Sequence, residues 1–482
     1  MVRQRFDPLV EPEDERHWRS QLIHEGLLFP RVHAEYERYS RLPDRPGALK
    51  DLQRERLTAV LRHAVGAVPA YRRIGLTLAD GEEPWRWLSA FPSVSKLELA
   101  EGMIDHCDDD IDPTACRVLE TSGTSGVPLR MVRDDDALVH EWATALVRNQ
   151  RQGKAFDRTV LMPCLARTGR WFEYTSPGAG LARVAQFGLA GCEASDGAMF
   201  AERARYFRPD VLAGTPRNLV DFMQLLQAHG GQLPSVRSVV TCGELLVPAV
   251  RDALTEFFGL PVTDMYAMKE VGTIAVQCEA GSYHVESERL WLEVVDDDGA
   301  PLPEGRTGEI VITDLTNRAM PLIRYRTGDF GSLASAACLC GLPHKVMDLV
   351  EGRNPGELRR PDGTTLPVLW ATRTVRRHPV RRYQIVQEAD FSVTALLAPA
   401  PSFTAADAAE LTRNLEDVLG TGIPCQVRTI AEDAFHDAGR RKDVDFVSFL
   451  TGVSPTFGQG AAAEPEDRPH PVGGPASDHG RR

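Results

Sequence analysis

Residues 107–329 alternate short apolar runs with longer segments of helical periodicity. The helix-like segment 219–226 precedes Val239-Val240, and the segment 308–313 carries Ile310 and Ile312 in alternation. Such a succession is typical of α/β domains, in which strands and helices follow one another and most strands are parallel. The sequence therefore predicts an α/β fold with mixed, largely parallel sheets in a large N-terminal domain.

The two ends of the chain have a different texture. Residues 51–63 place Leu52, Leu57, Val60 and Leu61 on one face of a predicted helix, and Pro69 and Pro92 interrupt the pattern further on. Beyond about residue 354 we predict a strand pair (382–397), an amphipathic helix (406–419) and another strand (425–430). The predicted division is a large domain over 1–353, a small mobile α+β domain over 354–453, and a disordered tail over 454–482.

Composition excludes several classes of protein. The 482 residues contain 55 basic and 68 acidic side chains, a formal net charge of −13, so a general nucleic-acid binder is not expected. No segment approaches the roughly 18 apolar residues of a membrane span, and the N-terminus lacks an apolar signal segment. Nine cysteines in so long a chain do not form a small disulfide framework. We therefore predict a cytoplasmic protein with no nucleic-acid or membrane partner.

A hydroxyl- and glycine-rich segment lies between two predicted strands at residues 117–119 and 129–132. It lacks the Gly-Lys-Ser/Thr ending and the following helix of a Walker A loop. Backbone N–H groups turned inward at its glycines, together with its hydroxyls, suit a phosphate, although a polar hairpin turn has the same composition. The candidate residues are Thr121, Ser122, Gly123, Thr124, Ser125 and Gly126.

Further motifs follow in a fixed order: Leu212-Ala213-Gly214-Thr215-Pro216, Thr241-Cys242-Gly243-Glu244, Tyr266-Ala267-Met268-Lys269-Glu270, Gly308-Glu309, Arg324-Tyr325-Arg326-Thr327-Gly328-Asp329 and Gly352-Arg353. With the segment 121–126, they make the chain resemble the adenylate-forming superfamily of acyl-CoA synthetases and adenylation domains. The similarity is greatest to the phenylacetate-CoA ligase-like branch and covers roughly residues 61–449.

The resemblance implies a role for each motif. Thr121 to Gly126 would grip the phosphates of ATP, and Glu270 would ligate Mg²⁺. Asp329 would accept hydrogen bonds from the ribose hydroxyls, a task suited to a carboxylate. Tyr266 would stack on the adenine, Gly243 and Glu244 would line its other side, and Arg353 would contact ribose or phosphate at the domain hinge. Taken singly, Asp329 fits a turn cap and Tyr266 a core aromatic; within the ordered set we expect function.

A Cys-x-Cys pair, Cys338 and Cys340, has Cys278 and His284 upstream. Three thiolates and one imidazole form a common closed structural zinc set. Free, partly buried cysteines are the alternative, and His344 competes with His284 for the fourth position. The same pattern occurs in part of the phenylacetate-CoA ligase branch, so the resemblance favours zinc.

The chain departs from the family pattern in three places. Ala267 and Lys269 replace the small residue and the Ser or Thr usual in that motif, and Asn354-Pro355 follows the hinge in place of acidic residues. The family's C-terminal catalytic lysine normally follows a glycine, a position that Arg440 occupies here. We predict that Lys442, the only lysine after Lys345, takes that role, with Arg440 as the alternative and a solvated basic cluster as the reading without function.

Aromatic residues near position 172 suit a flat pocket for an aryl acid, and small residues near 214 leave room for a ring. Both groups are equally compatible with a packed core. Lys269 is either a surface residue or an additional phosphate contact. The candidate substrate-pocket residues are Phe172, Tyr174, Gly214, Thr215 and Lys269.

We therefore expect an AMP-forming acid–thiol ligase. It would condense a carboxylic acid, aromatic by expectation, with ATP and pass the acyl group to coenzyme A. One alternative is transfer to an amine, a carrier protein or another small nucleophile; others are a silent nucleotide-binding scaffold and, more remotely, DNA binding by the arginine-rich N-terminal region. A homodimer is the usual assembly in the resembling family.

Overall fold

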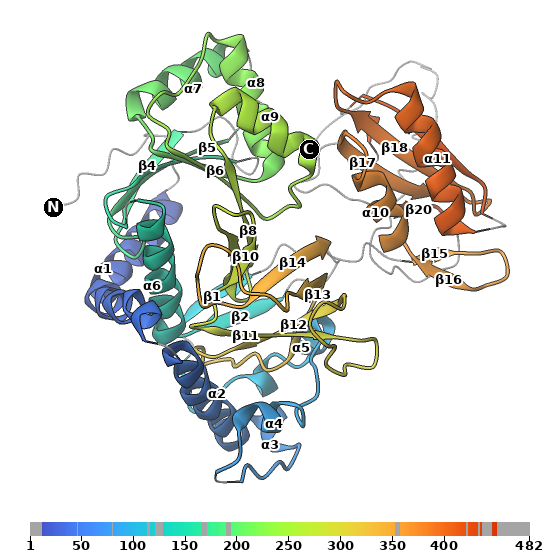
Figure 1. Ribbon diagram of the computed structural model, residues 1–482. Coiled ribbons are helices and arrows are strands. Elements are labelled where there is room, and N and C mark those ends of the chain that lie inside the picture. Colours follow the sequence, from blue (N-terminus) through green and yellow to red (C-terminus); the bar gives the residue numbers. More distant parts are fainter. Residues whose placement is uncertain are drawn as a thin grey trace, which may run out of the picture.

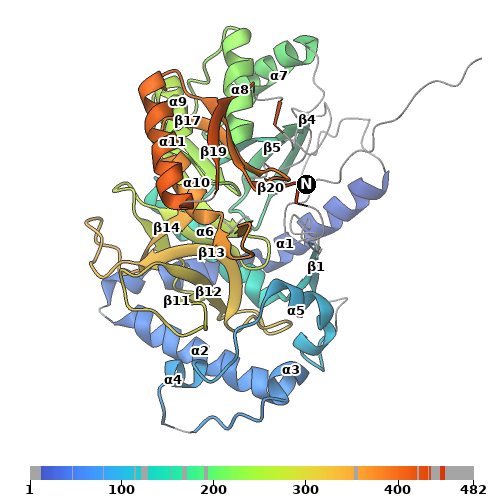
Figure 2. The same ribbon diagram turned by 90° about the vertical axis from the view of Figure 1, so that its right-hand side faces the viewer.

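The computed structural model describes residues 12–45, 47–79, 81–112, 116–120, 129–153, 155–164, 171–188, 194–351, 357–420, 423–431, 434–435 and 446–450. The described elements form a large domain and a smaller one, which Figure 1 draws on the right and Figure 2 brings to the front. The predicted hinge and the predicted disordered tail lie outside the described residues, so the domain limits and the mobility of the small domain stay predictions.

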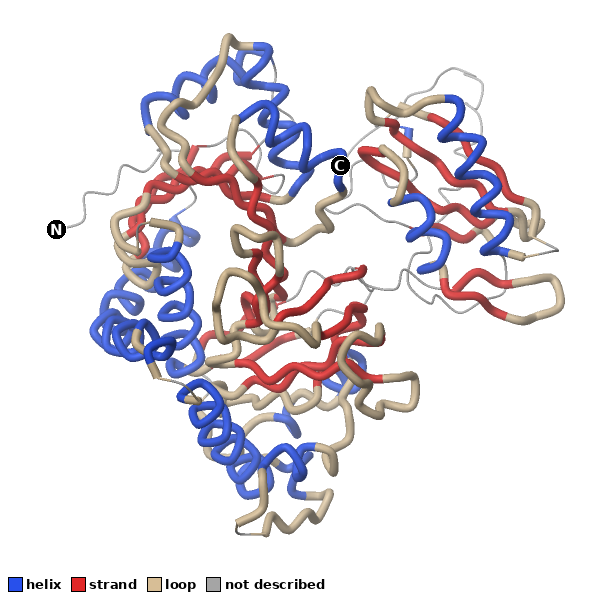
Figure 3. Tube along the Cα trace, in the orientation of Figure 1, coloured by secondary structure: helices blue, strands red, loops and turns tan. Residues whose placement is uncertain are grey.

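A twelve-stranded sheet of order β11-β12-β13-β14-β10-β9-β8-β7-β6-β3-β5-β4 runs through the large domain. Figure 3 shows it as a strongly bent band with helices around it. Its strands are β3 (Thr159–Cys164), β4 (Trp171–Ser176), β5 (Ala182–Gly188), β6 (Val211–Gly214), β7 (Ser238–Cys242), β8 (Val262–Met268), β9 (Gly272–Gln277), β10 (Tyr283–Val285), β11 (Leu290–Val295), β12 (Gly308–Asp314), β13 (Tyr325–Leu333) and β14 (Val346–Glu351).

The α/β prediction is confirmed, but the parallel share of the sheet is smaller than expected. Within the described strands, parallel pairing joins only β5, β3, β6, β7 and β8. All other neighbours in this sheet are antiparallel. The connections from β8 to β9 and from β9 to β10 are short, and a short connection between neighbouring strands makes them antiparallel. Strand β8 is therefore parallel to one neighbour and antiparallel to the other.

Helices cover the parallel part of the sheet. The helices α7 (Ala194–Phe207), α8 (Pro216–Ala228) and α9 (Pro248–Phe258) share a buried apolar core with β3 and β5 to β8. Helices α1 (Pro12–Ser40) and α6 (Asp135–Arg151) pack on each other beside β4. Each strand-to-helix step begins with a local signal, as at Thr215, whose side chain caps α8 while proline fills the first helical position.

The N-terminal helices pack near the antiparallel part of the sheet. The predicted amphipathic helix is α2 (Ala48–Ala67), and Leu52, Leu57, Val60 and Leu61 are all buried as expected. It ends where Pro69 opens the next helix. The short elements that follow or precede it are η1 (Leu42–Asp44), α3 (Pro69–Arg72), α4 (Pro84–Leu88), α5 (Lys96–Glu101) and η2 (Ile104–His106).

The two strands predicted around the glycine-rich segment are present. They are β1 (Arg117–Glu120) and β2 (Arg130–Arg133), which pair antiparallel with Glu120 opposite Arg130. Met131 and Val132 are buried in the same core as Tyr266 and Tyr325. The hairpin is therefore held close to the strands that carry the other motifs.

The small domain has its own apolar core. Its four-stranded sheet has the order β19-β18-β17-β20, and the predicted strand pair, helix and further strand all occur in it. Its elements are β15 (Glu357–Arg359), β16 (Thr365–Pro367), α10 (Leu369–Arg376), β17 (Val380–Gln387), β18 (Val393–Pro399), α11 (Ala405–Leu419), β19 (Cys425–Thr429) and β20 (Phe446–Ser448). In the described part of the chain, no helix combines the length and the apolar content that a membrane crossing requires.

Candidate active site

The pair Tyr266–Asp329 joins the two most specific motifs. Tyr266 lies on β8 and Asp329 on β13, and both side chains are at least nine-tenths buried. The Tyr266 hydroxyl donates a hydrogen bond of 2.6 Å to Asp329 Oδ2. Because an ionised carboxylate offers about four acceptor positions, this contact leaves Asp329 with acceptor capacity for further donors. The two predicted nucleotide residues are therefore in direct contact.

The backbone around Asp329 is held by the Gly308-Glu309 motif. Glu309 accepts a hydrogen bond of 2.8 Å from Arg326 Nε and one of 3.2 Å from the backbone N–H of Gly328. The hydrogen bond that Arg326 donates to Glu309 also raises the pKa of Arg326. Thr327 Oγ1 accepts the backbone N–H of Asp329 at 3.0 Å. The motif therefore fixes the turn from which Asp329 projects.

Glu270 follows β8 directly and is 2% exposed. Tyr325 donates a long hydrogen bond of 3.5 Å to Glu270 Oε1, and Lys96 Nζ lies 4.0 Å from the same oxygen. Lys96 is held in place as the first residue of α5, where Ser95 and Glu98 form a capping box. A carboxylate this deeply buried requires charge or hydrogen-bond partners, and these side chains supply them.

Lys269, next to Glu270, is exposed. Its Nζ donates a hydrogen bond of 3.1 Å to the carbonyl of Glu120, the residue that immediately precedes Thr121. The predicted phosphate segment 121–126 lies outside the described residues, as do Arg353, Arg440 and Lys442. Lys269 nevertheless connects the Glu270 turn to the strand that leads into that segment.

The carboxyl ends of β6, β7 and β8 lie side by side. Gly214, the last residue of β6, pairs with Thr241, and Cys242 at the end of β7 pairs with Met265. Gly243 has a φ of +82°, which glycine adopts readily, and a Cβ there would lie 3.8 Å from Thr215 Cγ2. The motifs containing Gly214, Thr215, Gly243 and Glu244 thus meet at one edge, the usual ligand position in an open α/β sheet.

Gly214 also has a packing role, since a Cβ at this position would lie 3.0 Å from Leu219 Cδ2 on α8. The small residue expected to leave room for a ring therefore also accommodates the helix behind the sheet.

Phe172 and Tyr174 are on the edge strand β4, five strand positions from β8. Their rings are neighbours, with centroids 5.4 Å apart, and Tyr174 Oη accepts a hydrogen bond of 3.1 Å from Gln186. Trp171 instead stacks on Phe187 in the core beneath α7 and α8. Since side chains alternate along a strand, Phe172 and Tyr174 face away from that helical core.

The four predicted zinc ligands converge. Cys278 follows β9, His284 lies on β10, and Cys338 and Cys340 belong to the loop between β13 and β14. Their ligand atoms all lie within 4.8 Å of one another. The Sγ atoms of Cys278 and Cys338 are 3.7 Å apart, and Cys340 Sγ is 3.2 Å from His284 Nε2.

His344 does not join this cluster as the fourth member. Its Nε2 lies 2.7 Å from Glu288 Oε1, and both side chains are buried. Burial alone would raise the pKa of Glu288, but the ion pair with His344 lowers it to about 2. The imidazole of His344 is thus engaged with a carboxylate on the far side of His284.

Comparisons with known proteins agree with this arrangement. The profile of a family described as AMP-binding enzyme matches residues 72–316, just over half of the 482-residue chain. The chain belongs to the AMP-binding enzyme family.

Within this family, curated relatives are phenylacetate-coenzyme A ligases. The protein from Thermus thermophilus is 28% identical over 334 residues, which cover 63% of this chain and 70% of the relative. The protein from Escherichia coli is 26% identical over 321 residues, covering 64% and 71%. The chain is therefore similar to phenylacetate-coenzyme A ligases over nearly two thirds of its length.

Solved structures share the fold of this AMP-binding enzyme. A 2-hydroxyisobutyryl-CoA ligase in its postadenylation state aligns with a TM-score of 0.65 at 18% identity, covering 84% of this chain and 90% of the other. An open conformation of that ligase, in complex with 2-HIB-AMP and CoA, aligns with a TM-score of 0.58 at 18% identity, covering 82% and 90%.

Two residues of the site were not assigned from the sequence. Tyr325 lies inside a recognised motif, but nothing in the string shows that its hydroxyl reaches Glu270. Lys96 is separated from Glu270 by 174 positions in the sequence. The one sequence feature that could have indicated a role for Lys96 is that the chain has only six lysines. Both act on the same buried carboxylate.

Proposed function

We propose that this protein condenses a carboxylic acid with ATP to form an acyl-adenylate and pyrophosphate, and then transfers the acyl group to coenzyme A. The main support is the contact between Tyr266 and Asp329 beside the buried Glu270, in a member of the AMP-binding enzyme family.

The residues divide the work of the first step. Asp329 accepts the ribose hydroxyls, Tyr266 stacks on the adenine, and Gly243 and Glu244 line the other side of the base. The segment 121–126, with Lys269 at its approach, holds the phosphates. A carboxylate oxygen of the acid then attacks the α-phosphorus in line, the bond to the β-phosphate oxygen breaks, and pyrophosphate leaves. This step depends on positioning and charge neutralisation, without a protein nucleophile.

Magnesium fits the Glu270 carboxylate. The ion commonly uses one or two protein carboxylates together with substrate phosphates. Among the described residues, the buried carboxylate of Glu270 has a long hydrogen bond from Tyr325 and a lysine at 4.0 Å. When bound, the ion would neutralise charge on the triphosphate. Lys96 supplies positive charge to the same carboxylate.

The acid is proposed to be aromatic. Phe172 and Tyr174 are directed away from the helical core, and the small residues at the end of β6 lie between them and the nucleotide residues in the strand order. Glu173 accepts the indole N–H of Trp171 at 2.7 Å, so its carboxylate is engaged locally. We therefore favour an uncharged aryl group over an amino-substituted one.

The small domain is proposed to complete the site. Lys442, or alternatively Arg440, would approach the α-phosphate, and Arg353 would contact the nucleotide at the hinge. Alanine variants of Lys442 and Arg440, assayed separately in the adenylation half-reaction, identify which cation is used. Unchanged rates in both would remove the small domain from this step.

We also propose one structural Zn²⁺ bound by Cys278, His284, Cys338 and Cys340. For tetrahedral zinc with Zn–S bonds of about 2.3 Å, sulfur atoms lie about 3.8 Å apart, close to the 3.7 Å between Cys278 and Cys338. The ion would fix the end of β9 to the loop after β13, the strands beside Glu270 and Asp329. Elemental analysis of purified protein, prepared without chelators, should give one zinc per chain; a sample without zinc would end the proposal.

The deciding experiment is pyrophosphate release with ATP and Mg²⁺ across a panel of aryl and amino-aryl acids, with and without coenzyme A. Release that depends on one class of acid, with a thioester formed when coenzyme A is present, supports the proposal. Release that ignores coenzyme A would redirect it to an amine or carrier-protein acceptor. Asp329→Ala serves as the inactive control. Nucleotide binding without release for any acid would favour a silent scaffold. The cytoplasmic location and the homodimer remain predictions.

A further inference from the structure

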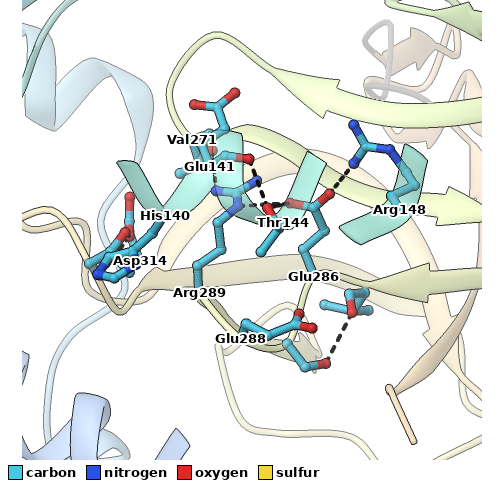
Figure 4. A network of polar contacts seen from close by, with 12 residues as sticks. His140, Glu141, Thr144, Arg148, Val271, Glu286, Glu288, Arg289 and Asp314 are labelled. Carbon is cyan, nitrogen blue, oxygen red and sulfur yellow. Dashed lines mark hydrogen bonds and ion pairs between the residues drawn. The ribbon is translucent and has the colours of Figure 1, made fainter. Parts of the chain in front are cut away.

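A buried polar network lies directly behind the Glu270 turn. Its centre is Arg289, whose side chain is fully buried. Figure 4 shows its guanidinium between Glu286 and Val271, with Glu141 and Asp314 nearby. Arg289 Nε donates a hydrogen bond of 2.8 Å to Glu286 Oε2, and Nη1 donates one of 2.6 Å to the carbonyl of Val271.

The contact with Val271 is a contact with the turn that presents Glu270. Val271 is the next residue after Glu270, and its carbonyl oxygen is fixed by a charged donor. Hydrogen bonds with an ionised partner are roughly twice as strong as neutral ones. Rotation of the Val271–Gly272 peptide would break this bond, so Arg289 restricts the backbone of the turn that carries Glu270.

Glu141 holds the other side of the same turn. Gly272 has a φ of +75°, and a Cβ built there would lie 2.1 Å from Glu141 Oε1. The carboxylate of Glu141 therefore rests on the turn backbone, where only glycine fits. Arg133 donates to Glu141 from β2 and keeps this carboxylate in place.

The charges of the network are balanced inside the protein. Burial alone would lower the pKa of Arg289, but the carboxylates of Glu286, Glu141 and Asp314 hold it above the usual value. Glu286 also accepts a hydrogen bond of 2.8 Å from Thr144 Oγ1 and one from the guanidinium of Arg148, both on α6. The Nη2 atom of Arg289 is buried and has no hydrogen-bond partner among the residues that the structure describes. A buried ionic network calls for a role beyond packing, because replacing the whole of such a network by well-packed apolar residues is often neutral or stabilising.

We propose that Arg289 and Glu141 are positioning residues, which clamp the 270–272 turn and so orient the Glu270 carboxylate toward the metal–nucleotide complex. This inference rests on the proposed function, in which Glu270 ligates Mg²⁺. Neither residue touches the nucleotide. Their effect reaches the ligand through the Val271 carbonyl and the Gly272 backbone.

The test measures ATP binding by calorimetry, once with Mg²⁺ and once with EDTA, in Arg289→Lys and Glu141→Gln. Groups that orient a metal ligand typically change metal affinity by about 10- to 100-fold. We expect the gain in ATP affinity on adding Mg²⁺ to fall about 10-fold in Arg289→Lys and to fall also in Glu141→Gln, while affinity in EDTA stays near the wild-type value. Two variants are used because a fully buried arginine can be needed for folding.

Arg251→Lys is the matched control. Arg251 Nη1 also donates a hydrogen bond of 2.6 Å to a backbone carbonyl, that of Val262. This residue lies at the start of β8, whereas the Glu270 turn follows the end of β8. The proposal is overturned if Mg²⁺ increases the ATP affinity of folded Arg289→Lys or Glu141→Gln as much as it does in the wild type. It is also overturned if Arg251→Lys loses as much of this increase as the two variants do. The assumption that Glu270 ligates Mg²⁺ is tested separately, with the wild-type protein and with Glu270→Gln. If Mg²⁺ does not increase the ATP affinity of the wild type, or increases it equally in Glu270→Gln, Glu270 is not the metal ligand.

Discussion

Replacing Tyr266 by phenylalanine removes one hydroxyl and leaves the ring. The lost bond is a 2.6 Å donation to the carboxylate of Asp329, with both side chains buried. Hydrogen bonds to charged groups contribute about 1.5–3 kcal/mol, and the remaining carboxylate would stay buried with one donor fewer. We therefore expect the free energy of unfolding of the large domain to fall by about 2 kcal/mol.

The same change should weaken nucleotide binding. In the proposed function, the hydrogen bond from Tyr266 to Oδ2 holds the Asp329 carboxylate in the orientation that accepts the ribose hydroxyls. Loss of this orientation should raise the KM for ATP about 10-fold, equivalent to about 1.4 kcal/mol, with a smaller change in kcat. Discrimination against 2′-deoxy-ATP should fall as well, because it depends on the ribose hydroxyls reaching Asp329.

Urea denaturation and pyrophosphate-release kinetics measure the two effects. Tyr283→Phe is the matched control, since Tyr283 also donates to a buried carboxylate, that of Asp264, away from the ribose position. It should lower stability without changing the KM for ATP. Tighter ATP binding by Tyr266→Phe would refute the reasoning, because it would mean that the hydroxyl competes with the ribose for Asp329.

Three further predictions concern other parts of the molecule. Cys338→Ser should reduce the zinc content from one per chain to none and remove the loss of thermal stability caused by chelators, whereas Cys107→Ser should behave as wild type; zinc retained by Cys338→Ser contradicts the assignment. Lys269→Met should raise the KM for ATP about 5-fold, the effect of about 1 kcal/mol of charge interaction at a wet surface, and Lys345→Met, which removes an exposed lysine paired with Glu304, should not. Burial lowers the pKa of His140 to about 2, so its neutral form contributes stability that is present above the unfolded-state pKa of about 6.5 and is lost as the pH falls. The free energy of unfolding should differ between pH 7 and pH 5 by about 2 kcal/mol less in His140→Gln than in the wild type. An equal difference in the two proteins would exclude His140 as the cause.

Local features of the sequence predicted local structure well. The strands on both sides of the segment 121–126 were identified from short apolar runs, and the structure pairs them as a hairpin. The helix that begins after Thr215 has both of its start signals in the sequence, a hydroxyl cap and a following proline. Such signals depend on neighbouring residues alone, so no knowledge of the fold is needed to find them.

Contacts between distant segments could not be found in this way. Arg289 is an ordinary charged residue in the sequence, and two of the three carboxylates around its buried side chain, those of Glu141 on α6 and Asp314 on β12, come from distant elements. The choice between His284 and His344 as the fourth zinc ligand depends on strand pairing, because β10 pairs with β14 and brings His344 to Glu288. The overestimate of parallel strands has a related cause, since apolar alternation does not record strand direction.

Strand β8 separates two kinds of architecture, parallel on the side of β7 and antiparallel on the side of β9. The residues assigned to ATP after Tyr266 belong to the antiparallel side, whereas the proposed acid-facing aromatics belong to β4, beyond the parallel strands. For protein engineering, this means that acid preference can be altered by exchanging the segment that contains β3, β4 and β5 while the residues assigned to ATP on either side of it are kept. The crossover points for such chimeras lie at the end of α6 and at the start of α7.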